Sequence, residues 1–292
     1  MAVIHRQYEG IQDYDEIREF LEKEYGNYET RFDHNLTLFE FQTALSCGLG
    51  DQVKTIDEVL EKVHLWFNGD RLVGVLEEGA FYVAADNRFI FDEMVEVGEN
   101  SFPEMEWEVY DGDSDFEEVL SKRVFLKSEE YWVRRDFDLS QTVDGLGLAK
   151  GYEVRSVPDL QEHEEVFQAY KLCYGLLFNQ TMFERFYETS TYRKELDLVV
   201  TGPDDQIVAL CSGRYDKRNE LVTIEAVACF PEYRGRGISK ALLRASLIAA
   251  KELGATQATV YTGMPEKFPA PNRLYESAGF ELVGKRYVWK KE

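Results

Sequence analysis

The segment FPEYRGRGISK, residues 230–240, decides the fold of this 292-residue chain. A β-rich run, residues 221–229, leads into it, and the residues after it have the spacing of an amphipathic helix. The glycines of the turn let several backbone N–H groups converge at the helix N-terminus, where the helix dipole also favours negative charge. The spacing matches neither the P-loop pattern GxxxxGK[ST] nor the Rossmann pattern GxGxxG. We therefore expect a turn that holds a pyrophosphate without a catalytic metal.

The turn resembles the acetyl-CoA motif of the GCN5-related N-acetyltransferases (GNAT), written [RQ]-x-x-G-x-[GA]. Arg234 and Gly237 fill its fixed positions, and Ser239 stands where the family has Gly or Ala. A second family motif, L-Y-x-x-x-G-F, is present as residues 274–280, in the right order and at about the right distance. The resemblance covers residues 152–292 well.

Charge and composition argue against several other classes. The net charge is −22, and residues 1–148 hold 35 acidic and 13 basic side chains, whereas residues 149–292 hold 20 of each. Nucleic acid is not an expected partner, because phosphate contacts need a basic surface. We expect neither a membrane span nor a secretory signal, since the chain has no long apolar run. The cysteines and histidines lack metal-ligand spacing, so we expect no metal, reduced thiols and a cytoplasmic location.

The chain also has the pattern of an internal repeat, which predicts an α/β fold (an α+β mixed sheet) in two tandem GNAT-like domains. We predict a first domain over residues 1–140, a linker over 141–151 and a second domain over 152–292. The repeated features are acidic helix starts at 13–16 and 159–162, hairpins at 64–77 and 197–215, later strands ending at 109–112 and 260–263, and closing strands at 131–134 and 287–290.

The first domain is expected to be a degenerate copy. Tyr110 follows Asp70 by 40 residues, but Tyr261 follows Asp205 by 56. The missing 16 fall where the phosphate-binding turn and its helix would be, and residues 87–91 in that place contain no glycine. We therefore predict no acetyl-CoA loop in this domain, which would shape the acceptor pocket or stand in for a dimer partner.

The resemblance implies which residues bind acetyl-CoA. In the family, a bulge splays the strand before the turn from its neighbour, and the pantetheine arm hydrogen-bonds along the gap. A free N–H of this strand, such as that of Val227, would face the thioester oxygen. Asn272 could contact the pantetheine or cap its own helix, and Phe268 stands where the family often has an Asn. The predicted cofactor-binding residues are Val227, Ala228, Cys229, Arg234, Gly235, Arg236, Gly237, Ile238, Ser239, Lys240 and Asn272.

Two side chains are the predicted catalytic residues. The resemblance places Tyr275 near the CoA sulfur, as the general acid for the thiolate; the alternative is a core aromatic. Glu225 lies within an apolar strand, where burial would raise its pKa toward that of a useful base. It could instead point to solvent or pair with Arg214. If Glu225 is not the base, the amine arrives neutral or an acid such as Glu77 or Glu78 serves.

The resemblance implies an acetyl-CoA-dependent N-acetyltransferase that acts by direct attack of a primary amine of a small molecule or peptide. Alternatives are a different acyl donor, and a CoA-binding sensor or interaction module without turnover. A monomer and a homodimer both remain open. Candidate acceptor-binding residues, which could also be core, are Tyr170, Tyr174, Phe178, Phe183 and Phe186.

Overall fold

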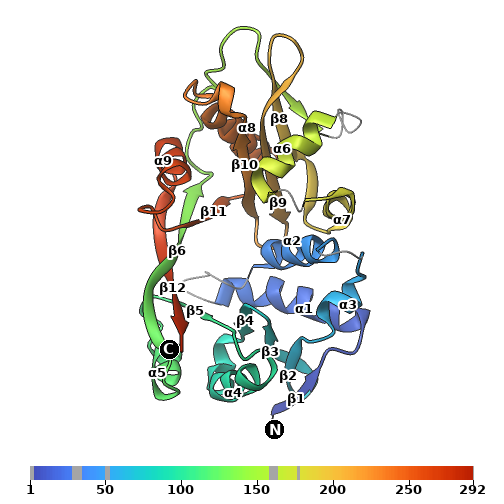
Figure 1. Ribbon diagram of the computed structural model, residues 1–292, viewed down its shortest axis with the longest axis vertical. Helices are drawn as coiled ribbons and strands as arrows, with labels where there is room; N and C mark the ends of the chain where they lie inside the picture. Colours follow the sequence, from blue (N-terminus) through green and yellow to red (C-terminus); the bar gives the residue numbers. More distant parts are fainter. Residues whose placement is uncertain (1–2, 28–34, 50–52, 158–163, 176–177, 292) are drawn as a thin grey trace. The chain divides into compact units, whose positions relative to one another are not determined.

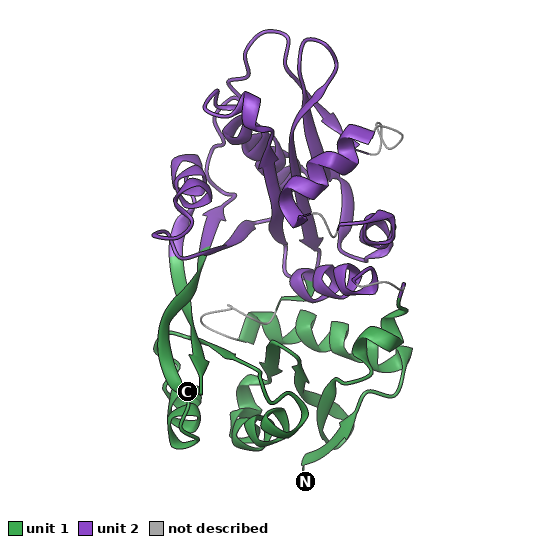
Figure 2. Ribbon diagram, in the orientation of Figure 1, with its two compact units in different colours: residues 1–36, 54–134, 283–292 green, residues 37–53, 135–282 purple. Residues whose placement is uncertain are grey.

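The computed structural model describes residues 3–27, 35–49, 53–157, 164–175 and 178–291 (Figure 1). The chain divides into two compact units that are interleaved along the sequence (Figure 2): unit 1 holds residues 1–36, 54–134 and 283–292, and unit 2 holds residues 37–53 and 135–282. Strands β6 (Leu126–Asp138) and β12 (Glu281–Lys290) contribute residues to both units. The units are therefore not two contiguous halves of the chain. Residues 37–53, from the first half, belong to unit 2, and residues 283–292, from the second half, belong to unit 1. The assignment of domains to residues 1–140 and 152–292 stays a prediction.

Unit 1 is built on an antiparallel sheet with strand order β1-β2-β3-β4, and its strand β5 pairs with β12. The predicted hairpin around Gly69-Asp70 is confirmed, with Gly69 at a φ of 64° in the turn between β2 and β3. The other elements of this unit lie between or after these strands. In chain order the elements are β1 (Val3–Gln7), α1 (Ile11–Glu24), η1 (Tyr25–Asn27), α3 (Ile56–Leu60), β2 (His64–Asn68), β3 (Arg71–Glu77), β4 (Ala80–Val83), η2 (Ala85–Ile90), α4 (Phe91–Ser101), β5 (Trp107–Tyr110) and α5 (Ser114–Lys122).

Two expectations for the first half are wrong in detail. Helix α1 begins after Gly10, and Asp13 lies inside its first turn, where its carboxylate accepts two hydrogen bonds of 2.7 and 2.6 Å from the Arg6 guanidinium. The helix that was expected to be missing is present as α4. The interval is shorter in part because β4 has 4 residues and α4 has 11, whereas the second half has a strand of 9 and a helix of 15; these two differences account for 9 of the 16 residues. The second acidic helix start, residues 159–162, lies outside the described residues.

Unit 2 is built on a mixed sheet with strand order β6-β11-β10-β9-β8-β7, in which β7 to β10 are antiparallel and β10 runs parallel to β11. This confirms the mixed α/β fold and the second hairpin, which is formed by β8 and β9. The elements are α2 (Leu36–Cys47), β7 (Glu153–Ser156), α6 (Glu164–Tyr174), α7 (Gln180–Glu188), β8 (Tyr192–Thr201), β9 (Ile207–Asp216), β10 (Leu221–Cys229), η4 (Pro231–Tyr233), α8 (Ile238–Glu252), β11 (Gln257–Gly263) and α9 (Pro269–Ala278).

The central strand β9 is buried along its whole length because both faces of the sheet are covered. Helix α8 packs on one face, and α2, α6 and α7 contribute to the apolar cluster on the other (Figure 1). Helix α8 buries Ile238 and Leu242 as its apolar spacing predicts, and Gly254, at a φ of 92°, follows its end. The core therefore holds the turn before α8 against a rigid sheet.

Helix α2 comes from the first half of the sequence but packs within unit 2. The Glu40 carboxylate accepts hydrogen bonds from the backbone N–H (2.9 Å) and hydroxyl (2.8 Å) of Thr191, and from the Ser190 hydroxyl (2.7 Å). The Thr37 hydroxyl lies 2.6 Å from that of Thr223 on β10. These buried polar contacts fix α2 to the sheet close to the strand that leads into the glycine turn.

Candidate active site

The turn between β10 and α8 presents backbone donors at a helix N-terminus. Gly235 and Gly237 have φ values of 74° and 78°, a conformation that glycine adopts without steric cost. The first hydrogen bond of α8 runs from the Ala241 N–H to the Gly237 carbonyl at 3.0 Å, so the N–H groups of residues 238–240 precede the helical ladder. The Arg234 guanidinium donates to the Cys229 carbonyl at 3.0 Å and ties the turn to the end of β10. This arrangement can bind an anion such as a pyrophosphate.

Strand β10 leaves its parallel neighbour just before this turn. It pairs with β9 along its length, with a bulge between Ile224 and Ala226. Within the described residues, its pairing with β11 covers residues 221–223 alone. Glu225 is the extra residue of the bulge, which bends the strand locally. The backbone of residues 226–229 is thereby separated from β11, which leaves that edge of the strand free for an extended ligand.

A cavity of about 690 Å³ lies along this strand end, the turn and helix α9. It is large enough for a cofactor arm. Its wall contains most of the residues that the sequence predicts for cofactor binding, together with Tyr275. The lining residues from that prediction are Val227, Ala228, Cys229, Arg234, Gly235, Gly237, Ile238, Ser239 and Lys240.

Tyr275 reaches the cavity wall from helix α9. The helix ends at Gly279, whose φ of 100° permits a hydrogen bond of 3.0 Å from the Phe280 N–H to the Tyr275 carbonyl. The Phe280 ring contacts that of Tyr275 edge-on, with centroids 5.7 Å apart. Burial raises the pKa of the Tyr275 hydroxyl, with a smaller contribution from nearby thiols and Glu225, so the side chain carries its proton at neutral pH. A protonated hydroxyl beside the cavity has the form that a general acid needs.

Glu225 is not among the cavity-lining residues, but its proton affinity is strongly perturbed. Burial raises the pKa of its carboxyl to about 8, and the Arg214 guanidinium opposes that rise. The strand register places Arg214 opposite Thr223, two residues before Glu225. A carboxyl with this pKa can exchange a proton near neutral pH. The alternative candidate Glu77 lies at the end of β3 in unit 1, where burial raises its pKa to about 7.

Asn272 and Arg236 are not brought to the cavity wall. The Asn272 amide donates to the carbonyls of Gly263 (3.0 Å) and Phe268 (2.8 Å). Its oxygen accepts from the Thr262 hydroxyl at 3.1 Å and from the Arg135 guanidinium at 3.3 and 3.4 Å. Asn272 is 2% exposed, so the structure favours its alternative role of bracing the start of α9. Arg236 donates to the Glu232 carbonyl (2.9 Å) and the Tyr152 hydroxyl (3.3 Å).

The comparisons with known proteins agree with this geometry. The sequence model of the acetyltransferase (GNAT) family matches residues 163–280. The chain contains a GNAT domain. None of the curated proteins compared matches the chain. The matched residues include the bulged strand, the glycine turn and all of α9 with Tyr275.

Solved GNAT structures share the fold over most or nearly all of the chain. A GCN5-related N-acetyltransferase from Sphaerobacter thermophilus is 17% identical, with a TM-score of 0.65 over 99% of this chain and 95% of that one. A GNAT-family acetyltransferase from Colwellia psychrerythraea is 12% identical, with a TM-score of 0.63 over 99% and 100%. A tandem GNAT protein from the clavulanic acid biosynthesis pathway is 13% identical, with a TM-score of 0.55 over 87% and 94%.

The aromatic residues proposed to line the acceptor site form a packed cluster instead. Tyr170, Phe178, Phe183 and Phe186 are each at most 8% exposed and lie in one apolar core with Phe41 of α2. Tyr174 is partly exposed and stacks on Tyr170 with centroids 6.1 Å apart. These contacts show a structural role for the four buried rings, because their surfaces are already used in packing.

Several cavity residues were not predicted from the sequence. Leu274 and Ser277 flank Tyr275 within the second motif, so their place in that motif was a usable signal. Leu172 of α6 is 42% exposed although it is a large apolar residue, and Arg273 is a basic residue beside an anion site. In the described part of the chain, no group of three or more His, Cys, Asp or Glu side chains could hold a metal ion. Of the helices described, none has the length and apolar character that crossing a membrane requires.

Proposed function

We propose that the GNAT domain transfers the acetyl group of acetyl-CoA directly to a primary amine of a small molecule or peptide. The observation that carries this proposal is the single cavity wall formed by the splayed end of β10, the glycine turn and Tyr275. The residues fit the cosubstrate: the N–H groups of residues 238–240 would hold its pyrophosphate, and the free edge of residues 226–229 its pantetheine arm. Acetyl-CoA would supply a thioester that is reactive toward amines.

In this proposal, three residues serve the remaining steps of the reaction: removal of the amine proton, stabilisation of the oxyanion and protonation of the departing thiolate. Glu225 would accept the proton of the attacking amine, directly or through a water molecule. The Val227 N–H would stabilise the negative charge that develops on the carbonyl oxygen. Tyr275 would donate its proton to the sulfur as the carbon–sulfur bond breaks. Proton loss at the nitrogen and proton gain at the sulfur then balance.

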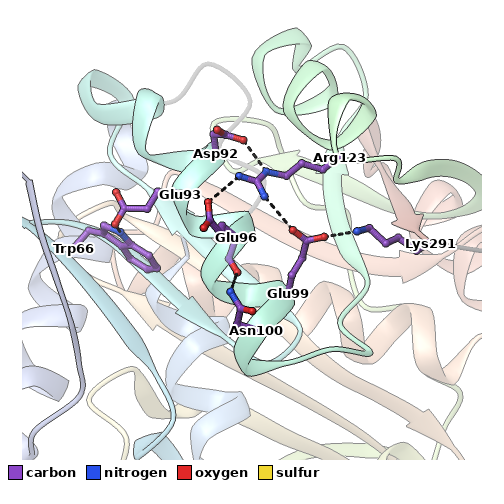
Figure 3. Close-up of polar contacts among 8 residues, drawn as sticks. All are labelled: Trp66, Asp92, Glu93, Glu96, Glu99, Asn100, Arg123 and Lys291. Carbon is purple, nitrogen blue, oxygen red and sulfur yellow. Dashed lines mark hydrogen bonds and ion pairs between the residues drawn. The ribbon is translucent and has the colours of Figure 1, made fainter.

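We also propose that unit 1 is a degenerate GNAT-like copy that does not bind acetyl-CoA. Helix α4 takes the place of the phosphate-binding helix, but its N-cap is Ile90 and its first turn carries Asp92 and Glu93. Asp92 is bound by Arg123, and Glu93 accepts from the Trp66 indole at 3.3 Å (Figure 3). Two carboxylates at a helix N-terminus disfavour a phosphate group, because they occupy the positive end of the dipole.

The test is turnover with a panel of amines that includes a polyamine, an amino sugar and a lysine peptide. The full chain is incubated with acetyl-CoA, and each acetylated product is detected by mass spectrometry. The proposal predicts at least one product whose rate of formation falls at least about tenfold when Tyr275→Phe replaces the wild type. Binding of acetyl-CoA without any product would favour a non-catalytic CoA-binding module instead, and product with a longer acyl donor alone would identify a different acyltransferase.

A further inference from the structure

Several charged and hydroxyl side chains share one face of the unit 2 sheet. The register pairs Asp197 of β8 with Ser212, and Arg214 with Thr223. Residues two apart on a strand point to the same side, so Ser212 and Arg214 of β9 face the same way. Their neighbours Val199 and Leu210 belong to the apolar cluster that α2, α6 and α7 cover. This face is therefore a buried polar site set inside an aromatic core.

Arg214 is the cation of this site, and among the described residues it forms no close ion pair. It is 1% exposed, and its carbon Cζ lies 4.9 Å from the ring centroid of Phe186 and 5.3 Å from that of Tyr192. Its Nε and Nη1 atoms are buried and have no hydrogen-bond partner among the described residues. A guanidinium that packs on rings keeps its positive charge in a medium of low polarity, where that charge acts over a longer range than in water.

The Arg214 charge acts on two carboxyl groups. Asp197 accepts hydrogen bonds from the hydroxyls of Tyr170 (2.5 Å) and Tyr192 (3.5 Å), and these bonds and the Arg214 charge together oppose the rise in pKa that burial causes. For Glu225, the Arg214 guanidinium is the group that opposes the effect of burial on its pKa. Asp197 therefore has hydroxyl donors in addition to the cation.

The tyrosine hydroxyls and cysteine thiols around this site are neutral at neutral pH. Burial raises the pKa of each of these groups, so their charged forms are rare. The nearby acid of α2, Glu40, is bonded to Ser190 and Thr191. The neutral groups are Tyr170, Cys173 and Tyr174 of α6, Cys211 of β9 and Tyr275 of α9.

We propose that Arg214 is a positioning residue for the transfer reaction: its buried guanidinium acts on Glu225 and so sets the pH range in which the acceptor amine loses its proton. This inference rests on the proposed function, because it takes Glu225 as the base. The proton moves from the amine nitrogen to the Glu225 carboxylate, and Arg214 makes that carboxylate available. Without the cation, the carboxyl keeps its proton to higher pH and cannot accept another.

The experiment measures the titration of Glu225 and the pH–rate profile in the same full-length variants. Glutamate labelled with ¹³C at the carboxyl carbon gives the titration by NMR, and Glu225→Gln identifies its resonance. Arg214→Met should raise the titration midpoint by about one pH unit or more and move the acidic limb of kcat/KM equally. At pH values above the shifted acidic limb, the kcat/KM of Arg214→Met should return to within about threefold of the wild-type value. Arg214→Lys, which keeps the charge, should leave both midpoints within about half a unit.

A second variant, Asp197→Asn, should shift the Glu225 midpoint in the opposite direction. It keeps the inference testable even if Arg214→Met does not fold. Asp197→Asn removes the competing carboxylate but keeps an oxygen for Tyr170, so the Glu225 midpoint should fall.

Unchanged NMR midpoints in these variants, or a rate loss that is equal at every pH, would overturn the inference. A wild type that binds acetyl-CoA but acetylates no amine would defeat the proposed function and with it the catalytic role of Arg214, whereas the NMR midpoints would still show separately whether Arg214 acts on Glu225. An NMR shift without a shift of the rate limb would show that Arg214 acts on Glu225 but not on catalysis, which would also overturn the inference.

Discussion

The substitution Glu225→Gln should stabilise the protein at neutral and alkaline pH. The carboxyl of Glu225 has an ordinary pKa of 4.5, and burial raises that pKa to about 8 in the folded chain. The folded state therefore binds this proton more tightly than the unfolded state does. The stability that the protonated Glu225 carboxyl contributes to the folded state is fully present below pH 4.5 and is lost as the pH rises through 8. Glutamine has no proton to lose, so the variant should not show this loss.

The size of the effect follows from the same pKa values. A difference of 8 − 4.5 = 3.5 in pKa corresponds to an upper bound of about 4.8 kcal/mol in the free energy of unfolding. Because the Glu225 side chain is partly exposed, solvent screening reduces the effect, and we expect about 2 kcal/mol. Wild type should lose about this much stability relative to Glu225→Gln between about pH 5 and about pH 8.5.

Urea unfolding at the two pH values measures this difference. The matched control is Glu195→Gln, which changes an exposed glutamate on strand β8 of the same sheet and should alter stability by less than about 0.5 kcal/mol at either pH. If Glu225→Gln were no more stable than wild type at the higher pH, the raised pKa that we describe for the Glu225 carboxyl would be wrong.

Three further substitutions test separate parts of the site. Tyr275→Phe should lower turnover at least about tenfold, which is about 1.4 kcal/mol of barrier, with little change in acetyl-CoA affinity by calorimetry; unchanged turnover would remove the general-acid role. Gly237→Glu should abolish acetyl-CoA binding in the same calorimetric assay because it places a bulky anion at a φ of 78°, whereas Gly145→Glu, on an exposed segment, should bind as wild type does. Asn272→Ala should cost about 2–3 kcal/mol in urea unfolding, since it leaves buried donors and acceptors unpaired, and a loss below about 0.5 kcal/mol would show that its hydrogen bonds do not matter.

The parts of the site that could be predicted from the sequence are local in the chain. Gly235 and Gly237 have positive φ values because the turn and the start of α8 require them. The residues that form the turn and the helix start lie within a few positions of these glycines in the sequence. Gly279 likewise ends α9 and places Tyr275 by contacts within the same helix. A short motif can therefore specify the anion-binding turn and the position of the tyrosine.

The parts that could not be predicted depend on contacts between distant residues. Glu40 bonds to Thr191 across 151 positions of sequence, so nothing near α2 indicates that it packs in unit 2. Asn272 is bonded to Arg135 across 137 positions, and this bond turns a candidate ligand residue into a structural one. The interval between Asp70 and Tyr110 predicted a missing helix, because spacing alone cannot distinguish a lost element from several shortened ones.

Calorimetric titration of acetyl-CoA into the full chain would show whether the chain has one binding site for the cosubstrate. We expect saturable binding with a stoichiometry of one, because the glycine turn follows β10 in unit 2, whereas the first turn of α4 in unit 1 is acidic. A stoichiometry of two would contradict the degenerate role of unit 1. No binding at all would contradict the proposed acetyltransferase function.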